Sequence, residues 1–299
     1  MWARNSMKIV VCLKEVVDIR LDLGLGQVSE SLIQKGLTYR LNPDDADALA
    51  VALSIRNGEN SVDITAISIG PERVEKYLRE ALAVGATKAV RIWDEGFIDL
   101  STYQKAKVLA RAISILNADL VLTGAKSLDV ASGQVGPYLA AWLNLPCICE
   151  AVEFHLEGAK RCITVTRNIN RGIQEKVFTA LPAVITIAGQ PRHLPYASLD
   201  SLLESKETLV DLLTLEDLGI TPLELSRDPT RVTRLSAPRP RPRKVPYDSS
   251  LPAFYRILAL LQGGITKRRG EILQGSKEEL VNQLFELLMK EGLIKPSVK

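Results

Sequence analysis

The sequence predicts an α/β fold of the Rossmann-like kind, with a mostly parallel sheet that carries helices on both faces. Short β-branched runs alternate with segments of helical periodicity up to residue 143. Strand-like runs then follow one another between residues 147 and 187 without a long helix between them. Parallel strands need a covering crossover helix, whereas strands joined by short turns pair antiparallel. The later strands should therefore extend the sheet, partly in the antiparallel sense.

The individual elements follow from local patterns. The first expected strand, residues 8–13, precedes a polar, glycine-containing stretch at 18–27 that is typical of a loop or hairpin. Asn42 and Pro43 suit the N-cap and first position of a helix, and the aspartates that follow suit its positive end. The other expected strands are 63–69, 89–92, 120–123, 147–154, 161–167, 173–179 and 183–187, and the other expected helices begin after 71, cover 102–117 and occupy most of 133–143.

Beyond residue 187 the pattern changes. Residues 188–226 are typical of an exposed loop that leads into a short helix and an arm, so the α/β domain should span 7–187. The remainder, 227–299, begins with a linker. Between residues 227 and 244 it contains seven basic residues, one acidic residue and several prolines, which is typical of an extended segment. Helical periodicity returns in two segments, 251–262 and 276–290, the second of which opens with a capping-box pattern.

Composition narrows the function classes. Apolar residues make up 46% of the 299 residues and charged residues 24%, which supports a substantial core. A net charge of +3 gives no global case for nucleic-acid binding, and the linker has no aromatic residue for base stacking before Tyr247. No apolar run reaches the roughly 18 residues of a membrane helix, and the residues before Met7 lack a signal-peptide core. We expect a cytoplasmic protein.

The chain shows no catalytic or metal-binding constellation. It has two histidines, and it contains no Ser-His-Asp set, paired-acid motif or nucleophile elbow. We therefore expect no catalytic residue and no metal. The four cysteines are typical of buried strand positions, which indicates a reducing compartment and no disulfide scaffold. They are Cys12, Cys147, Cys149 and Cys162.

Three segments should end at the ligand-binding edge of the sheet, because ligands of open α/β sheets bind beyond the carboxyl ends of the strands. Cys12 ends the first strand, Ile69 ends the second, and the small-residue-rich segment 124–136 follows a later one. The last part of that segment lies near a helix start, where free N–H groups and the helix dipole bind anions. The residues at that start are Ser132, Gly133, Gln134 and Val135.

Chemistry assigns roles within segment 124–136. Gly133 would let a phosphate approach the backbone closely, and the Ser132 hydroxyl would add a donor. Asp129 would repel a phosphate, so it either holds the loop or binds a ribose hydroxyl. The alternative is an ordinary strand-to-helix turn with a glycine cap. The segment is neither a GxGxxG fingerprint nor a Walker loop, so spacing alone leaves both interpretations open.

Several segments, taken together and in order, resemble the β subunits of electron-transfer flavoproteins, the family that includes FixA. Each motif alone is weak, but the ordered set is specific, and it covers roughly residues 7–225. The segments are Lys8 to Lys14 with Val17-Asp18, Leu41 to Asp44, Ala66 to Pro71, Ala81 to Ala86, Asp119 to Gly136, Leu181 to Val184, and Pro195 to Leu199.

The resemblance implies a heterodimer with a larger α subunit, which carries electrons through FAD between a dehydrogenase, such as an acyl-CoA dehydrogenase, and an acceptor oxidoreductase. That FAD lies at the interface, mainly in the α subunit. Many β subunits hold a structural AMP, whereas electron-bifurcating members hold a second FAD in the same pocket, and both ligands stay open here. The pocket maps onto Cys12, Asn42, Ile69, Gly124, Asp129, Ser132, Gly133, Gln134 and Val135.

The resemblance also implies partner-binding residues. The segment around Tyr196 and Leu199 is similar to the family's recognition loop, in which a leucine matching Leu199 inserts into a pocket of the partner dehydrogenase. The simpler alternative is that Leu199 only begins a short helix. Residues 168–172 are neutral to basic where many members carry an acidic residue and a Gly-Gly pair, so flavin contacts are not carried over to them.

The C-terminal extension after residue 226 is longer than in ordinary members of the family. It suggests a further partner, such as a second dehydrogenase or a membrane-associated oxidoreductase subunit, through which the protein would associate peripherally with a membrane. Two other function classes stay open. A universal-stress-type module would bind an adenine nucleotide as a homodimer without flavin. A nucleic-acid-binding protein would use residues 227–244 in a salt-dependent manner, although we expect no nucleic-acid partner.

Overall fold

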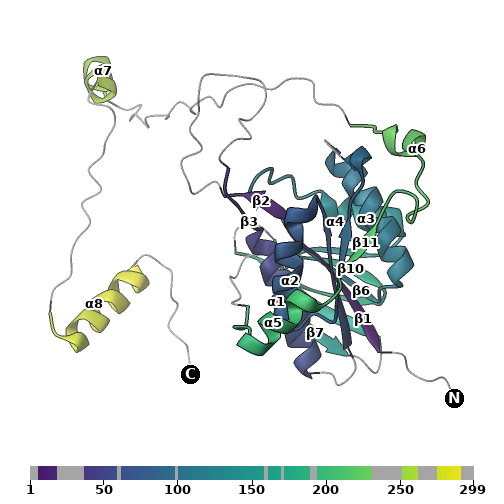
Figure 1. The fold of residues 1–299 in the computed structure, drawn as a ribbon. Coiled ribbons are helices and arrows are strands. Elements are labelled where there is room, and N and C mark those ends of the chain that lie inside the picture. Colours follow the sequence, from purple (N-terminus) through teal and green to yellow (C-terminus); the bar gives the residue numbers. More distant parts are fainter. Residues whose placement is uncertain are drawn as a thin grey trace. The chain divides into compact units, whose positions relative to one another are not determined.

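The structure is a computed structural model that describes residues 6–18, 37–58, 62–97, 100–157, 161–169, 172–188, 194–230, 251–261 and 275–290. The chain divides into two compact units, residues 1–236 and 237–299. The first unit is an α/β domain built around one large sheet (Figure 1). The second contains the last two helices, α7 (Ala253–Leu261) and α8 (Lys277–Lys290).

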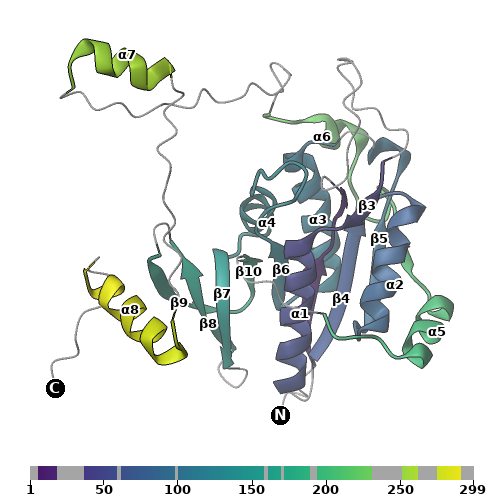
Figure 2. The ribbon, with the colours of Figure 1, turned by 90° about the vertical axis from the view of Figure 1, so that its left-hand side faces the viewer.

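The nine-stranded sheet confirms the expected fold class. Its strand order is β11-β5-β4-β1-β6-β10-β7-β8-β9. The strands from β11 to β7 are parallel, and β8 and β9 extend the sheet antiparallel (Figure 2). The strands are β1 Met7–Cys12, β4 Val62–Ile69, β5 Lys88–Ile92, β6 Leu120–Gly124, β7 Cys147–Glu157, β8 Cys162–Asn168, β9 Gln174–Ala180, β10 Ala183–Ile187 and β11 Asp211–Leu213.

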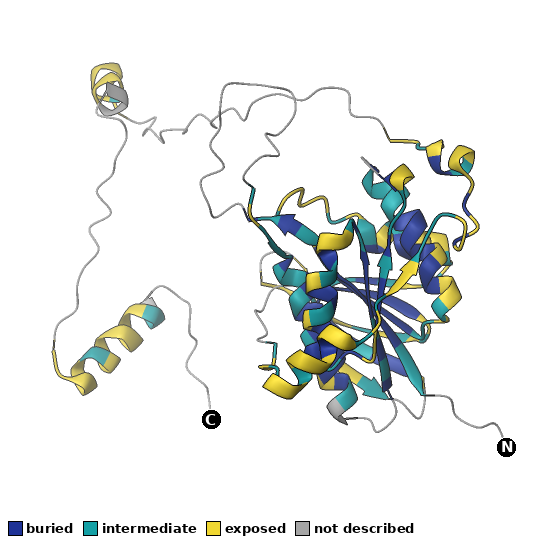
Figure 3. Cartoon of the chain, in the orientation of Figure 1, coloured by how far each residue is buried: buried dark blue, intermediate teal, exposed yellow. Residues whose placement is uncertain are grey.

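Helices cover both faces of this sheet, as the alternating pattern predicts. The helices α1, Pro43–Gly58, and α2, Glu75–Ala83, bury apolar side chains against one face. The helices α3, Thr102–Leu116, and α4, Val135–Leu143, do so against the other. Two short 3-10 helices, η1 Glu72–Val74 and η2 Glu95–Phe97, follow β4 and β5. Figure 3 shows buried residues concentrated along the central strands and exposed residues on the outer sides of the helices.

A short antiparallel ribbon follows β1. It pairs β2, Glu15–Val17, with β3, Tyr39–Leu41. The expected loop or hairpin at 18–27 lies between these strands, and apart from Asp18 it falls outside the described residues. The ribbon leads directly into Asn42 and α1, so it connects the end of β1 at Cys12 to Asn42, two residues that the family resemblance assigns to the pocket.

The segment 194–230 packs back onto the α/β domain. The short helix α5, Leu199–Glu207, contacts α2, and Arg79 donates hydrogen bonds to three carbonyl oxygens at the end of α5, at 2.8–3.0 Å. Strand β11 then pairs with β5, and α6, Pro222–Ser226, is tied to α3 by the Lys107–Glu224 ion pair of 2.9 Å. The packing of α5, β11 and α6 against the α/β domain was not predicted from the sequence. That residues 188–226 serve as an arm toward an α subunit stays a prediction.

The second unit contains α7, Ala253–Leu261, and α8, Lys277–Lys290. The expected capping box is formed, because Ser276 N–H donates to the Glu279 carboxylate at 2.9 Å and Glu279 N–H donates to Ser276 Oγ at 3.4 Å. Most of the basic linker, from residue 231 on, lies outside the described residues. Within the described parts of the chain, none of the helices has the length and apolar character needed to cross a membrane.

The expectation that all four cysteines are buried is wrong for two of them. Cys12 and Cys162 are buried, whereas Cys147 and Cys149 are only partly buried. The reason lies in the pairing of β7, which begins at Cys147 beside β10 but meets β8 only from Ala151 onward. The first residues of β7 therefore have a neighbouring strand on one side only, which leaves Cys147 and Cys149 partly exposed.

Close contact between α4 and β10 leads to a prediction. Gly136 lies in the first turn of α4, and a Cβ atom there would overlap Cγ2 of the buried Thr186. Gly136→Ala should therefore lower the free energy of unfolding by about 1–3 kcal/mol, since overpacking a tight contact forces its neighbours apart. Urea denaturation of the purified protein measures this change.

The matched control removes the atom that collides. Thr186→Ser keeps the hydroxyl group and deletes Cγ2, so Gly136→Ala should cost much less in the Thr186→Ser background than in the wild type. Equal costs in both backgrounds would show that this contact does not limit the approach of α4 to the sheet.

Candidate nucleotide-binding site

A cavity of about 480 Å³ lies beyond the carboxyl ends of β1, β4 and β6. Strand β1 has β4 as its neighbour on one side and β6 on the other, so the strand order changes direction at β1. Ligands of open α/β sheets bind at such a point. The volume is in the range of small-molecule sites. Eight of the nine expected pocket residues line it, namely Cys12, Asn42, Ile69, Gly124, Ser132, Gly133, Gln134 and Val135.

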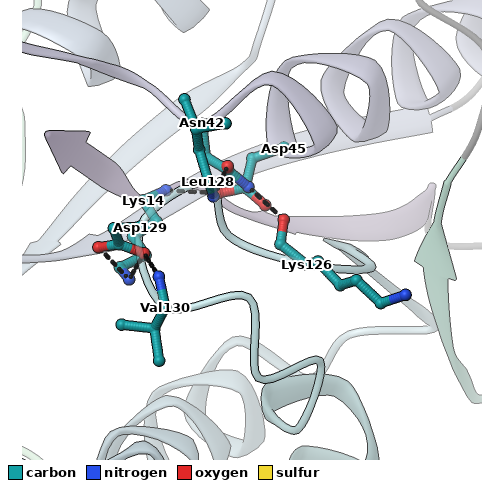
Figure 4. A network of polar contacts seen from close by, with 7 residues as sticks. All are labelled: Lys14, Asn42, Asp45, Lys126, Leu128, Asp129 and Val130. Carbon is teal, nitrogen blue, oxygen red and sulfur yellow. Dashed lines mark hydrogen bonds and ion pairs between the residues drawn. The ribbon is translucent and has the colours of Figure 1, made fainter. Parts of the chain in front are cut away.

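The ninth residue, Asp129, is not among the lining residues and holds the loop instead. Its carboxylate binds Lys14 Nζ at 2.7 and 2.8 Å and accepts the Val130 N–H at 2.7 Å (Figure 4). Burial raises the pKa of Asp129, but hydrogen bonds from Lys14 and Ser127 outweigh it and hold the pKa below its ordinary value. The Asp129 carboxylate therefore fixes the loop that follows β6 through these hydrogen bonds.

Asn42 fastens the same loop to the start of α1. Its Nδ2 donates to the carbonyl oxygen of Lys126, and its Oδ1 accepts the N–H of Leu128, both at 3.0 Å (Figure 4). Its backbone carbonyl accepts the first N–H groups of α1, at Asp45 and Ala46. The sequence therefore predicted the position of the N-cap correctly. The Asn42 side chain, however, uses both its amide nitrogen and its amide oxygen to bind the loop.

Asp45 joins three elements below the cavity. Its two carboxylate oxygens accept the N–H of Lys14, after β1, at 2.8 Å and the N–H of Gly124, at the end of β6, at 2.9 Å. It is buried, and burial raises its pKa to about 7, although the hydrogen bonds from Asn42, Gly124 and Lys14 oppose this shift. From the sequence alone, Asp45 was expected only to interact with the helix dipole, and its bonds to the N–H groups of Lys14 and Gly124 were not predicted.

Gly124 must be glycine for this arrangement. A Cβ at Gly124 would overlap Oδ1 of Asp45 and Cβ of Asp44. Further along the loop, Ala131 and Gly133 have left-handed backbones with φ of 52° and 64°. The glycine adopts this conformation without strain, which fits the role that the sequence assigned to it.

The N-terminal ends of α3 and α4 both border the cavity, and they differ in capping. The end of α3 is closed by a capping box, in which Ser101 Oγ accepts the Gln104 N–H at 3.2 Å and Gln104 Oε1 accepts the Ser101 N–H at 2.8 Å. The N-cap of α4 is Gln134, which makes no side-chain cap hydrogen bond within the described structure. The first N–H groups of α4 therefore have no side-chain cap from Gln134, in contrast to those of α3.

Basic side chains that the sequence reasoning missed also line the cavity. The guanidinium of Arg73 pairs with Glu15 at 2.5 Å and lies 4.5 Å from the ring centroid of Tyr39, while Lys126 pairs with Glu150 at 3.1 Å. No sequence signal singles them out, because these contacts join separate loops. The described residues contain no group of three or more His, Cys, Asp or Glu side chains that could hold a metal. The lining lysines and arginine are Lys14, Arg73, Lys105 and Lys126.

The two expected partner-binding residues lie outside this cavity and are strongly exposed. Tyr196 is fully exposed in the loop before α5, and Leu199 is 71% exposed at the first position of that helix. The Ser198 side chain caps α5 by accepting the Ser201 N–H at 3.1 Å. Because Arg79 holds the other end of α5, both side chains project from an anchored segment.

Comparison with known proteins gives a consistent family. The family model described as "Electron transfer flavoprotein domain" matches residues 31–193, more than half of the chain. The chain is 31% identical to an electron transfer flavoprotein subunit beta of Thermoanaerobacterium thermosaccharolyticum, over 96% of this chain and 100% of that protein. The C-terminal extension is therefore shared with at least this relative.

Two further relatives are similar over about four fifths of the chain. The caffeyl-CoA reductase-Etf complex subunit CarD of Acetobacterium woodii is 30% identical, over 78% of this chain and 88% of that protein. Protein FixA of Rhizobium meliloti is 31% identical, over 80% of this chain and 84% of that protein. With the fold and the cavity described above, these matches show that the chain belongs to the electron transfer flavoprotein family, as one of its β subunits.

Proposed function

We propose that this β subunit acts with an α subunit to carry electrons, through FAD, from a dehydrogenase to an acceptor oxidoreductase. Membership of the family supports the proposal, because β subunits of the family pair with α subunits and the family is associated with flavin. Flavin supplies the redox chemistry, while the protein supplies position and electrostatics. The universal-stress-type alternative loses its basis once the family is shown.

The cavity, in this proposal, holds an adenosine monophosphate moiety. The observation that carries it is the uncapped N-terminus of α4, which follows Gly133 in the cavity wall. Such an end binds a phosphate through backbone N–H groups and the helix dipole. Both AMP and the adenosine end of FAD contain this moiety, so the same site serves a simple carrier or a bifurcating subunit.

The nucleotide content of the purified αβ complex tests the proposal. We expect acid denaturation to release either one FAD and one AMP per αβ pair, as in a simple carrier, or two FAD, as in a bifurcating one. Chromatography with absorbance detection separates and counts both nucleotides. A colourless complex without affinity for flavin would contradict the electron-carrier function, and a flavin complex without a second nucleotide would contradict the assigned cavity.

The dehydrogenase partner in this proposal is of the acyl-CoA type. The relative CarD is named as a subunit of a caffeyl-CoA reductase-Etf complex, which supports a partner that acts on a CoA ester. The exposed Leu199, on a helix held at both ends, supports the docking role expected for it, since an apolar side chain presented by a rigid element is a suitable interface anchor.

Leu199→Ala should slow electron transfer from that dehydrogenase by about tenfold or more, because truncating an anchor side chain weakens docking by at least ~1.4 kcal/mol. Flavin content should not change. The matched control is Leu223→Ala in α6, since Leu223 is 70% exposed and differs from Leu199 mainly in position. Stopped-flow reduction of the flavin by the dehydrogenase gives both rates, and equal rates for the two variants would remove the anchor role of Leu199.

A further inference from the structure

Cys147 and Cys149 form a close pair of thiols at the start of β7, and neither lines the nucleotide cavity. Their sulfur atoms are 3.7 Å apart. Both side chains are partly exposed, while the two other cysteines are buried. Residues two apart on a strand share a face, so the backbone itself brings these two thiols together.

The backbone beside the pair is irregular. Glu150, the next residue, has a left-handed backbone with φ of 59°, and the register between β7 and β10 shifts between Ile185 and Ile187. The ladder between β7 and β10 is therefore interrupted next to the thiol pair. The thiol pair therefore lies where the strand can adjust its geometry more easily than within the regular ladder.

The two thiols have different electrostatic surroundings. The Cys147 and Cys149 sulfur atoms share a hydrogen bond, which together with the Thr186 hydroxyl of β10 and the Arg167 guanidinium of β8 lowers the pKa of Cys149 to about 6, against burial and the Glu150 carboxylate. The same hydrogen bond raises the pKa of Cys147. The Arg167 guanidinium is itself paired with Glu175 at 2.6 Å, and the Glu150 carboxylate is paired with Lys126 at 3.1 Å.

A metal site does not explain the pair. Structural zinc sites use four ligands from Cys, His or carboxylate side chains. Among the described residues, no group of three or more such side chains comes together, around this pair or elsewhere. Two adjacent thiols of which one is a thiolate near neutral pH instead match the chemistry of thiol–disulfide exchange, where one sulfur attacks and the other resolves.

We propose that Cys147 and Cys149 form a redox-active dithiol that reacts with small-molecule disulfides of the glutathione type. The Cys149 thiolate attacks one sulfur of the disulfide, whose S–S bond breaks and releases a thiolate that takes a proton from solvent. Cys147 then loses its proton to solvent and attacks the Cys149 sulfur, which releases the second thiolate. The protein dithiol is oxidised by two electrons, and the small disulfide is reduced to two thiols.

The Cys147–Cys149 disulfide formed in this way should be easily reduced again. Two residues of extended strand span about 6.6 Å between Cα atoms, near the upper limit of about 6.8 Å for a disulfide. A disulfide at this limit is strained and has a more oxidising potential than a structural one. The pair should thus stay reduced in a reducing compartment and close only when small disulfides accumulate.

Peptide mapping of the full-length chain, both alone and in its αβ complex, tests the proposal. After incubation with glutathione disulfide, we expect an internal Cys147–Cys149 disulfide that dithiothreitol removes, with the buried Cys12 and Cys162 still reduced as internal controls. Cys147→Ser should accumulate a stable mixed disulfide with glutathione at Cys149. Cys149→Ser should react at least about tenfold more slowly, because the lower-pKa thiolate is lost.

A pH profile gives a second readout that requires no substitution. The alkylation rate of Cys149 should rise with a midpoint near pH 6, because its thiolate forms there. A midpoint near the ordinary thiol value of about 8.5 would overturn its assignment as the attacking sulfur. Failure of the pair to form a disulfide in the full chain, its protection in the αβ complex, or equally fast reaction of Cys12 and Cys162 would overturn the proposal.

Discussion

Gly133→Asp is expected to lower the affinity of the subunit for its adenine nucleotide by about 100-fold or more. The side chain itself fits, since a Cβ at Gly133 would lie 3.4 Å from the Ala125 carbonyl oxygen and 3.6 Å from Lys126 Cγ. Its carboxylate would face the phosphate that we propose to be bound at the start of α4. Two like charges about 4 Å apart repel by ~4 kcal/mol near a protein surface, and each ~1.4 kcal/mol is tenfold in affinity.

Two matched variants separate charge from shape and from backbone conformation. Gly133→Asn has the same size and the same tolerance for a left-handed backbone, so the subunit should retain most of its nucleotide. Gly172→Asp introduces the same charge at another left-handed glycine, which has no neighbouring atom within 4 Å of its added Cβ. Nucleotide released from each purified complex is then counted. Equal loss in the Asp and Asn variants would indicate a steric effect, and full retention by Gly133→Asp would refute the assigned phosphate position.

Asp45→Ala is expected to lower the free energy of unfolding by about 3–5 kcal/mol at pH 6. The substitution leaves two backbone N–H groups, of Lys14 and Gly124, without their acceptor below the cavity. Each buried donor that loses its partner costs about 1–3 kcal/mol. The neighbouring Asp44→Ala is the control, because Asp44 is half-buried and accepts one N–H, from Lys126 at 3.2 Å. It should cost about 1 kcal/mol.

The destabilisation by Asp45→Ala should also depend on pH. Burial raises the pKa of Asp45 from 3.8 to about 7, so the folded state holds this proton more tightly than the unfolded state. The corresponding stability is fully present below about pH 4 and is lost as the pH rises through 7. The difference between wild type and Asp45→Ala, measured by urea denaturation, should therefore narrow from pH 5 to pH 8. A difference that stays constant over this interval would show that Asp45 is ionised throughout.

The sequence predicted the central strands and the place of the site because both depend on strong local signals. Short β-branched runs bounded by helical segments specify parallel strands, and the carboxyl ends of such strands must meet at one edge. Cys12, Ile69 and Gly124 end three of these runs, so their convergence around the cavity follows from topology. Gly133 was recognisable because small residues at a helix start have a clear physical use.

The remaining features depend on contacts between distant residues, which carry no local signal. Asp44 and Asp45 are adjacent and chemically identical, and only the fold shows that Asp45 faces the N–H groups that are 31 and 79 residues away. The three-residue strand β11 is too short to show a period of two, and its partner β5 lies far away in the sequence. The exposure of Cys147 and Cys149 follows from where β8 begins to pair, which periodicity does not encode.

The late position of β11 in the chain has a consequence for biosynthesis. Strand β5 is complete at Ile92, but the strand that covers its outer edge begins only at Asp211. While the intervening residues are translated, the ribosome-bound chain presents an uncovered row of backbone donors and acceptors along β5. Such edges template pairing between chains, and partly folded species that carry them aggregate. We therefore expect the nascent subunit to be protected from self-association along that edge only after residues 211–213 have left the ribosome and paired with β5.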